Sequence, residues 1–240
     1  MAVFAIGDLH LSGSGAKPMD IFGTHWENHF DQIKRNWMEM ITSEDLVLIP
    51  GDISWGMQFD EAKIDLDSIA ALPGTKVLIR GNHDYWWGSI ARLRAYLPKD
   101  MVALQNDAAA LMGLVVCGTR GWDFPTDGYP LSEQDEKIHR RELLRLEMAL
   151  QHAKRLGGPI IAMLHYPPLL REHRDTAYTV LLEQYGVALC VYGHLHSSGI
   201  ARGYSGVHRG VAYRLVSCDS ISFSPVKVWE DGLLPIMESP

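Results

Sequence analysis

Short apolar runs recur along the 240-residue chain, and they constrain its fold more strongly than any other feature. Runs of four or five apolar residues are typical of buried strands. They lie at residues 3–6, 46–49, 114–117, 160–164 and 188–192, and at 76–79 three apolar residues follow Lys76. Helical patterns separate the early runs, at residues 26–41, 59–71 and 88–96. Alternating strands and helices predict parallel βαβ units, and hence an α/β fold.

The second half of the chain adds a long charged helix and a strand-rich tail. We expect the helix at residues 132–156, with its charged side chains on a solvated face. Its expected buried positions are Ile138, Leu143, Leu146, Ala149 and Leu150. From Val211 onward, short apolar runs alternate with turns, which indicates antiparallel strands. No linker or repeat divides the sequence, so we expect a single α/β domain over residues 1–240.

Polar side chains follow five of the predicted strands at the point where each strand ends. Four of these ends contain a glycine that lets the chain turn sharply, and the fifth leads directly into His165. In an open α/β sheet, ligands bind beyond the carboxyl ends of the strands, so we expect these side chains to converge. The ends are GDLH (7–10), GD (51–52), GNHD (81–84), His165 and GHLH (193–196).

The expected cluster offers only oxygen and nitrogen donors, from carboxylates, imidazoles and one carboxamide. This mixture suits two divalent or trivalent ions of intermediate hardness, such as manganese, iron or zinc. If the chain stays extended, Asp8 and His10 project to the same side, and so do His194 and His196. A single histidine is usually a hydrogen-bonded or surface group, and a single Gly-Asp pair is usually a turn. Five coincidences at strand ends favour a metal site instead.

Together, the five blocks resemble the signature of the calcineurin-like metallophosphoesterases, D-x-H … G-D … G-N-H-[DE] … H … G-H-x-H. All five occur in order between residues 7 and 196, so the resemblance spans most of the chain. It implies a four-layer α/β/β/α sandwich, in which helices flank two mixed sheets and the site lies at one edge. It also implies metal-dependent hydrolysis of a phosphomonoester or phosphodiester. Two metal ions would be bound, and we expect Mn²⁺, with iron or zinc as alternatives.

The resemblance further implies a role for each residue of the blocks. His83 would protonate the leaving oxygen, and Asp84 would hold His83 in orientation. Seven other residues would bind the two metal ions. The first ion would take Asp8, His10 and His196, the second would take Asn82, His165 and His194, and Asp52 would bridge the two.

The expected mechanism follows from the negative charge of a phosphoester, which repels hydroxide. Two ions about 3.5–4 Å apart neutralise the phosphoryl oxygens and lower the pKa of a bridging water. The resulting hydroxide attacks phosphorus in line, opposite the leaving oxygen. A histidine general acid then supplies the proton, which accelerates the reaction about 10²–10⁴-fold.

Three residues beside the blocks are candidates for contact with the substrate: Trp55, Arg120 and His25. Trp55 either stacks on a nucleobase or packs beneath its loop, and the same holds for the aromatic residues 85–87. Arg120 either clamps a phosphate or forms a surface ion pair. His25 lies in the glycine-containing segment 12–26, a candidate for a mobile lid over the site.

Composition argues against several other classes of protein. The net charge of −7 disfavours broad nucleic-acid binding and attachment to anionic membranes, which leaves a small phosphorylated substrate as the expected partner. No apolar run approaches the roughly 18 residues that a membrane helix needs. The first ten residues lack the features of a signal peptide, and three separated cysteines fit a reducing compartment. We therefore expect a cytoplasmic protein.

Two functions without catalysis compete with this interpretation. A non-catalytic metal-binding scaffold of the same fold would lose ligand positions or the acid histidine, whereas the chain keeps all of them. A metal-storage or sensing protein would have no use for the His83–Asp84 pair, which supplies no ligand. The sequence therefore favours a metal-dependent phosphoesterase, either a phosphatase or a phosphodiesterase.

Overall fold

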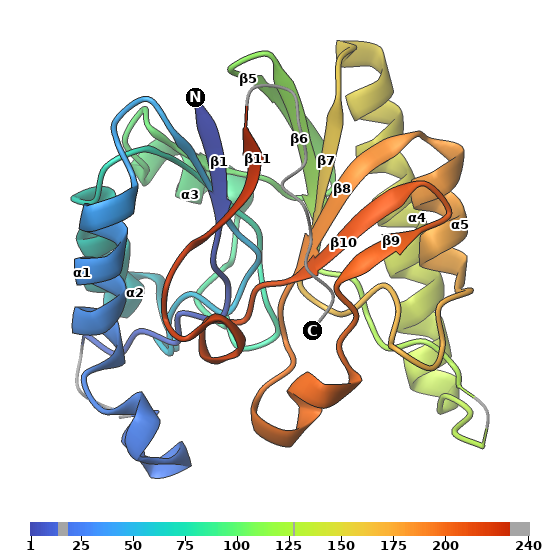
Figure 1. The fold of residues 1–240 in the computed structure, drawn as a ribbon, viewed down its shortest axis with the longest axis horizontal. Coiled ribbons are helices and arrows are strands. Elements are labelled where there is room, and N and C mark those ends of the chain that lie inside the picture. The colour runs from blue at the N-terminus through green and yellow to red at the C-terminus, as the bar shows by residue number, and fades with distance from the viewer. Residues whose placement is uncertain (14–18, 127, 231–240) are drawn as a thin grey trace.

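The computed structural model describes residues 1–13, 19–126 and 128–230, and two β-sheets form the centre of this part of the chain (Figure 1). In sheet order, the first contains β11 (Val226–Glu230), β1 (Ala2–Ala5), β2 (Leu46–Ile49), β3 (Thr75–Leu78) and β4 (Met101–Ala103). The second contains β5 (Asp107–Leu111), β6 (Leu114–Thr119), β7 (Ile160–Leu164), β8 (Val187–Tyr192), β10 (Val211–Leu215) and β9 (Gly206–His208). Each sheet is mixed: β1 runs parallel to β2 and antiparallel to β11, and β10 runs parallel to β8 and antiparallel to β9.

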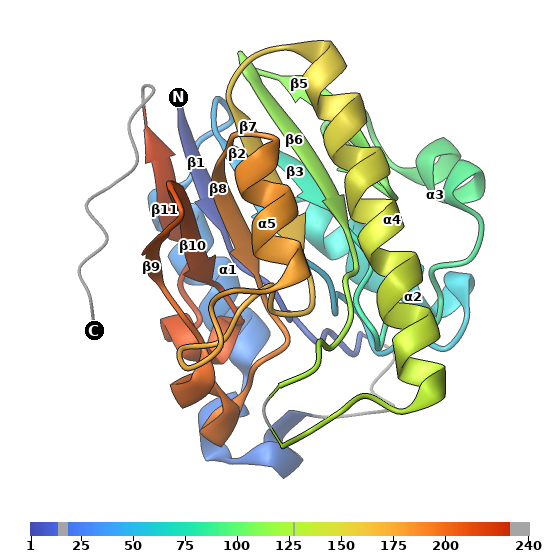
Figure 2. The ribbon, with the colours of Figure 1, turned by 90° about the vertical axis from the view of Figure 1, so that its right-hand side faces the viewer.

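Helices cover the outer face of each sheet. The first sheet carries α1 (His29–Met40), α2 (Phe59–Ala70) and α3 (Ile90–Tyr96), and the second carries α4 (Glu133–Leu156) and α5 (Ala177–Gln184) (Figures 1 and 2). The layers therefore follow the predicted order α/β/β/α. Short 3₁₀ helices lie in the connecting loops: η1 (Met19–Phe22), η2 (Thr24–Trp26), η3 (Ser197–Arg202) and η4 (Cys218–Ile221). None of the described helices combines the length and apolar character that crossing a bilayer requires.

Three hydrophobic clusters correspond to the three interfaces between the layers. Within β1, Phe4 packs toward the helices of its own sheet, whereas Val3 faces the second sheet. Within β6, Val115 packs toward α4 and Val116 faces the first sheet. These strands are buried on both faces, so their sequences are continuous apolar runs and do not alternate with polar residues.

The predicted elements agree with the structure to within a few residues, but one helix start, three elements and the direction of one strand differ from expectation. The helix expected at 26–41 begins only at His29. Asn28 has a left-handed backbone, which separates α1 from η2. The apolar and helical patterns also missed β4, which has only three residues, as well as β5 and α5. The expected antiparallel tail is partly wrong, since β10 runs parallel to β8. An apolar run specifies a buried strand but not its direction.

The charged face of α4 is also not wholly solvated, contrary to expectation. Glu142 is fully buried, and its carboxylate accepts a hydrogen bond from Arg145 Nη1 at 2.6 Å and another from Thr119 Oγ1 at 3.1 Å. A buried carboxylate is tolerated only when charged or hydrogen-bonding partners replace water. Those partners lie on β6 and on the next turn of α4, so helical periodicity could not reveal them.

The interface between the two sheets should dominate the stability of the fold. Leu48 is fully buried there, and we expect Leu48→Ala to lower the free energy of unfolding by about 2–5 kcal/mol, through lost burial and the cavity left behind. Urea denaturation measures this change. The matched control is Leu144→Ala on α4, where the side chain is 63% exposed and we expect a change within about 0.5 kcal/mol. Equal effects of the two substitutions would contradict this account of the core.

Candidate metal centre

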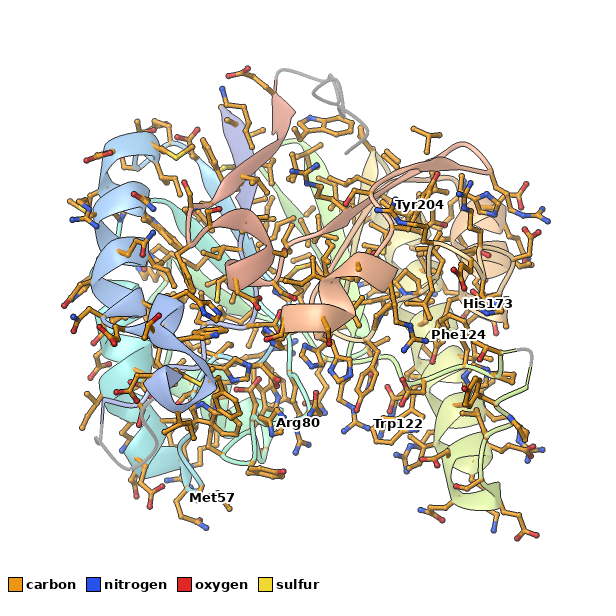
Figure 3. The ribbon with its side chains drawn as sticks, turned by 60° about the horizontal axis from the view of Figure 1, so that its bottom comes forward. Met57, Arg80, Trp122, Phe124, His173 and Tyr204 are labelled. Carbon is orange, nitrogen blue, oxygen red and sulfur yellow. The ribbon has the colours of Figure 1, made fainter. Side chains whose placement is uncertain are left out.

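The loops that follow β1, β2, β3, β7 and β8 meet at one edge of the two sheets. Backbone hydrogen bonds join them: Asp8 N donates to Gly51 O at 2.9 Å, and His10 N donates to Asp52 O at 2.9 Å. Across the sheets, His194 N donates to both carboxylate oxygens of Asp8 at 3.0 Å. Figure 3 views the molecule with this edge brought forward. Loops from both sheets therefore form this edge.

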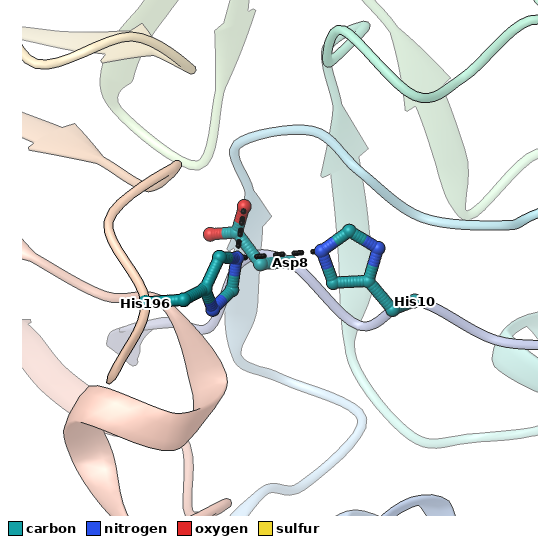
Figure 4. Close-up of side chains that lie close together, drawn as sticks. All are labelled: Asp8, His10 and His196. Carbon is teal, nitrogen blue, oxygen red and sulfur yellow. Dashed lines mark hydrogen bonds and ion pairs between the residues drawn. The ribbon is translucent and has the colours of Figure 1, made fainter. Parts of the chain in front are cut away.

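One cluster of donors brings together the side chains of Asp8, His10 and His196 (Figure 4). His10 Nε2 and His196 Nε2 are 3.3 Å apart, and His196 Nε2 is 3.5 Å from Asp8 Oδ1. Asp8 and His10 are buried, whereas His196 is partly exposed. These are the three residues expected to share the first metal ion.

A second cluster brings together Asn82, His165 and His194. Asn82 Oδ1 lies 2.6 Å from His165 Nε2 and 3.0 Å from His194 Nδ1, and those two nitrogens are 3.3 Å apart. His165 is fully buried. These are the three residues expected to share the second ion.

Asp52 lies between the two clusters. Its Oδ2 is 3.7 Å from His10 Nε2 in the first cluster and 3.5 Å from His165 Nε2 in the second. Asp8 also approaches the second cluster, since its Oδ1 is 3.8 Å from His165 Nδ1. Accordingly, Asp8, Asp52 and His165 form another group of donors whose spacing could hold a metal ion. A carboxylate in this central position can contact both clusters.

The separation between the two histidine nitrogens in each cluster fits a shared transition-metal ion. Two ligands about 2.1 Å from one ion, at octahedral or tetrahedral angles, lie about 3.0–3.4 Å apart. The nitrogen–nitrogen distances of 3.3 Å in both clusters fall in this range. Imidazole, carboxylate and carboxamide donors without thiolate match manganese, iron or zinc.

The backbone reaches this arrangement in a way that the sequence did not predict. Asp8, His10, Asp52 and His194 all have a left-handed backbone, with φ between 46° and 73°. The condition of an extended chain at 8–10 and 194–196, under which alternate residues would project to the same side, is therefore not met. Such a conformation is uncommon for residues other than glycine, and it is typical of sites where the surrounding structure imposes the geometry.

Glycines allow the loops to approach one another. A Cβ at Gly51 would lie 2.7 Å from Gly81 Cα and 2.8 Å from His165 Nδ1, and its φ of 91° is strained for any other residue. A Cβ at Gly81 would collide with the Asp52 carboxylate, and one at Gly193 would collide with the Asp8 carboxylate. The glycines before the candidate ligands therefore provide space as well as turns.

In two histidines, the ring nitrogen that is not the candidate ligand forms a hydrogen bond that holds the ring. His165 Nδ1 donates to Pro50 O at 3.0 Å, so its Nε2 is left as a potential ligand. His196 Nδ1 lies 2.9 Å from Asp219 Oδ1, and Asp219 also accepts from Ser197 N at 3.1 Å. Such outer partners fix the tautomer and orientation of metal-binding histidines. Sequence reasoning missed Asp219, because it lies in η4, outside every motif.

The charges of the site shift several pKa values. Burial raises the pKa of Asp52 to about 8, and the nearby Asp8 carboxylate adds to this rise. Burial would also raise the pKa of Asp8, but the hydrogen bond and charge of His196 hold it below its ordinary value. Burial would lower the pKa of His196, but hydrogen bonds to Asp219 and Asp8 raise it to about 10. In the metal-free protein at neutral pH, Asp52 and His196 therefore hold protons that bound cations would displace, whereas Asp8 is ionised.

His83 and Asp84 lie directly beside the clusters. His83 N donates to Asp52 Oδ1 at 2.8 Å, and the His83 ring lies 4.6 Å from the Trp55 ring. Asp84 is fully buried and accepts hydrogen bonds from the backbone N–H groups of residues 53, 54 and 81 and from Trp86 Nε1. Asp84 thus ties the loop after β2 to the loop after β3. Its direct effect on the His83 ring stays a prediction.

The three candidate substrate contacts differ in position. Trp55 stacks on His10, with ring centroids 4.9 Å apart, so it packs against the site. His25 is exposed in η2, 5.8 Å from the Trp26 ring. Arg120 forms an ion pair with Glu142 at 3.7 Å and lies over the Trp122 ring. The predicted lid at 12–26 includes residues 14–18, which lie outside the described residues.

Comparison with known proteins identifies the family of the chain and agrees with its fold. The family model of the calcineurin-like phosphoesterases matches residues 1–198. A protein of unknown function from Aquifex aeolicus is similar in structure, with a TM-score of 0.52, 17% identity and 94% of each chain covered. A candidate 5′-nucleotidase from Staphylococcus aureus, in complex with alpha-ketoglutarate, gives a TM-score of 0.46 and 13% identity; the match covers all of this chain and 55% of that one. No curated protein matches the chain.

Two mixed sheets flanked by helices, with donor clusters at one edge, define a metal-dependent phosphoesterase. The chain belongs to the calcineurin-like phosphoesterase family, because the family model covers most of its length.

Asp219 should strengthen metal binding through His196. We expect Asp219→Asn to weaken Mn²⁺ affinity about 10–100-fold, because the amide supports the imidazole less well than a carboxylate. Competition with a chromophoric chelator measures the affinity. The matched control is Asp60→Asn, an exposed carboxylate on α2 paired with Lys63, which should leave the affinity unchanged. Equal affinities for Asp219→Asn and wild type would contradict this role.

Metal binding should release protons near neutral pH. His196 and Asp52, with pKa values of about 10 and 8, are largely protonated at pH 7 in the metal-free protein, and a cation needs both deprotonated. The apparent affinity for Mn²⁺ should therefore rise from pH 6 to pH 8, by up to about tenfold per pH unit for each proton displaced. Calorimetry in buffers of different ionisation enthalpy counts the protons. A pH-independent affinity would show that the donors are already deprotonated.

Proposed function

We propose that the protein is a dimetal-dependent phosphoesterase that hydrolyses a small phosphorylated substrate. The observation that carries the proposal is the position of Asp52 between two donor clusters, with His83 beside them. A single metal ion in one cluster would not account for an Asp52 carboxylate that approaches donors of both clusters. We further propose that residues 1–240 act as one domain, because the site draws on loops from both sheets. We also propose a cytoplasmic location, because the three cysteines are separated in the sequence and fit a reducing compartment.

Seven side chains would hold the metals in this proposal. Bound ions would neutralise the phosphoryl oxygens and supply a nucleophile derived from water. The ligands of one ion would be Asp8, His10 and His196, those of the other Asn82, His165 and His194, and Asp52 would be shared. We favour Mn²⁺, with iron or zinc as alternatives, because the donors are oxygen and nitrogen atoms.

His83 would act on the leaving oxygen as a general acid. Its backbone is anchored to Asp52, and its ring packs beside the stacked pair of Trp55 and His10, with ring centroids 4.6 and 5.9 Å away. This packing restricts the ring to the edge of the site without making it a ligand. Asp84 would stabilise the turn that carries His83, through the backbone groups it binds.

The first experiment restores metals to stripped protein. Mn²⁺, Fe²⁺, Zn²⁺ and Mg²⁺ are added singly, and hydrolysis of p-nitrophenyl phosphate and bis-p-nitrophenyl phosphate is followed in parallel. Turnover restored by a transition metal supports the proposal, and the preferred substrate separates a phosphatase from a phosphodiesterase. Two bound ions per chain with no turnover of either ester would favour a non-catalytic scaffold.

His83→Ala should impair substrates with poor leaving groups most. An alkyl oxygen needs a proton as it departs, whereas p-nitrophenolate does not, so the loss should be about 10²–10⁴-fold for alkyl esters and much smaller for p-nitrophenyl esters. Values of kcat for both classes measure the difference, with the metal content checked in the same preparation. Equal losses for both leaving groups would exclude His83 as the general acid.

Asp52→Ala should release both metals. Removing the shared carboxylate takes one ligand from each ion and leaves two histidine-rich clusters without the central negative charge. Metal analysis of the purified variant should give well below one ion per chain, against two for wild type. Retention of one tightly bound ion would show that Asp52 serves a single metal.

A further inference from the structure

Four arginines surround a small cavity beside the candidate metal centre. The cavity has a volume of about 230 Å³ and lies between α4 and the segments that follow β3, β4 and β6. Among the described residues that line it, four carry guanidinium groups and one carries a carboxylate, which leaves an excess of three positive charges. The net charge of the whole chain is −7, so the cavity is a local reversal of sign. The five charged residues are Arg80, Arg120, Arg141, Arg145 and Glu142.

Glu142 holds one wall of this cavity in place. Its fully buried carboxylate accepts a hydrogen bond from Arg145 Nη1 at 2.6 Å, and it lies 3.7 Å from Arg120 Nη2 and 3.8 Å from Arg141 Nε. One guanidinium would neutralise this carboxylate, whereas three are gathered around it. Glu142 therefore fixes the arginines in position and leaves most of their positive charge uncompensated.

Arg80 lies on another wall of the cavity, and one of its guanidinium N–H groups lacks a hydrogen-bond acceptor among the described residues. This group is the buried Nε–H. A buried donor of this kind costs free energy unless a ligand or water satisfies it. Burial lowers the pKa of the neighbouring Arg120, and the charges of Arg80 and Arg141 lower it further, against the opposing effect of Glu142. The guanidinium groups are therefore close enough to repel one another, and an anion would relieve that repulsion.

The cavity adjoins the metal-centre loops directly. Arg80 immediately precedes Gly81, the first residue of the GNHD block. The carbonyl oxygen of Arg120 accepts hydrogen bonds from His165 N at 3.0 Å and Tyr166 N at 2.9 Å. In Figure 3, Arg80 and Trp122 lie on the edge of the molecule that is brought forward, and the Arg120 guanidinium lies 4.6 Å from the Trp122 ring centroid. A small molecule bound at the metals could therefore extend a second group toward the arginines.

We propose that this arginine cavity binds a second phosphate group of a substrate whose scissile phosphoester lies at the dimetal centre. The inference rests on the proposed function and narrows its substrate class to small molecules with two phosphate groups. Arginine suits this role, because its planar fork of donors matches the oxygens of a phosphate. The cavity is polar and small, which fits a single phosphate better than a nucleobase or an acyl chain.

Calorimetric titration with tungstate, a phosphate mimic, tests the two sites separately. We expect the Mn²⁺-loaded wild-type protein to bind two tungstate ions per chain. Arg145→Gln should lose one of these sites and keep its metals, whereas Asp52→Ala should lose the other. A single wild-type site that disappears in Asp52→Ala would overturn the cavity proposal and leave the metal centre intact. A single site that persists in Asp52→Ala but disappears in Arg145→Gln would instead count against the dimetal function.

A substrate series tests whether the cavity serves catalysis. Linear alkanediol bisphosphates of increasing length are compared with alkyl monophosphates of the same length. We expect kcat/KM to favour the bisphosphate about tenfold at one spacer length, the gain typical of a charged hydrogen bond. Arg145→Gln should abolish this preference, and Arg141→Gln, on the more exposed rim, should reduce it.

The matched control is Arg140→Gln on the same helix, where the side chain is exposed and pairs with Glu136 at 3.1 Å. This variant should keep the wild-type preference. A preference that is absent in wild type, or that survives unchanged in both Arg145→Gln and Arg141→Gln, would overturn the proposal.

Discussion

The structure depends on one electrostatic constraint, the crowding of carboxylates and imidazoles at the edge where the two sheets meet. Asp8, Asp52, His10 and His165 are all almost completely buried. Removing such groups from water costs free energy, which the hydrogen bonds among them offset only in part. Cations would supply the missing compensation, so folding of this edge and metal binding should be linked. In the metal-free protein, burial and the neighbouring Asp8 carboxylate raise the pKa of Asp52 for the same reason.

Rigid packing behind the edge makes this crowding sustainable. The strands are buried on both faces and fix the starting point of each loop, and inter-loop hydrogen bonds such as Asp8 N to Gly51 O then hold left-handed residues in place. The same frame carries the arginine cavity, because Arg80 continues β3 toward the GNHD block and Arg120 follows β6. The carboxylates of the candidate metal centre and the arginines of the cavity are thus separated by only a few residues of backbone. In our proposal, the arginine cavity selects a small polyanion, while the net charge of −7 disfavours binding to nucleic acid in general.

Much of the fold and of the candidate site could be predicted from sequence, because both rest on local signals. All six predicted apolar runs coincide with buried strands, and the polar residues directly after such strands lie at a sheet edge. The structure brings the donors of the five blocks together at such an edge, although their roles as ligands stay predictions. The local patterns missed the three-residue strand β4 and the helix α5, and they could not indicate the direction of a strand, as for β10.

By itself, the sequence determined the layers of the sandwich, the family and the chemical types of donor at the strand ends. Only the tertiary structure decided how those donors are oriented and supported. The left-handed backbones of Asp8 and His194, the support of His196 by Asp219, and the gathering of arginines around Glu142 all depend on contacts between distant segments. Periodicity and motif spacing report which face or end a residue occupies. They carry no information about which distant side chain will meet it, because that is fixed by the packing of both sheets and their helices.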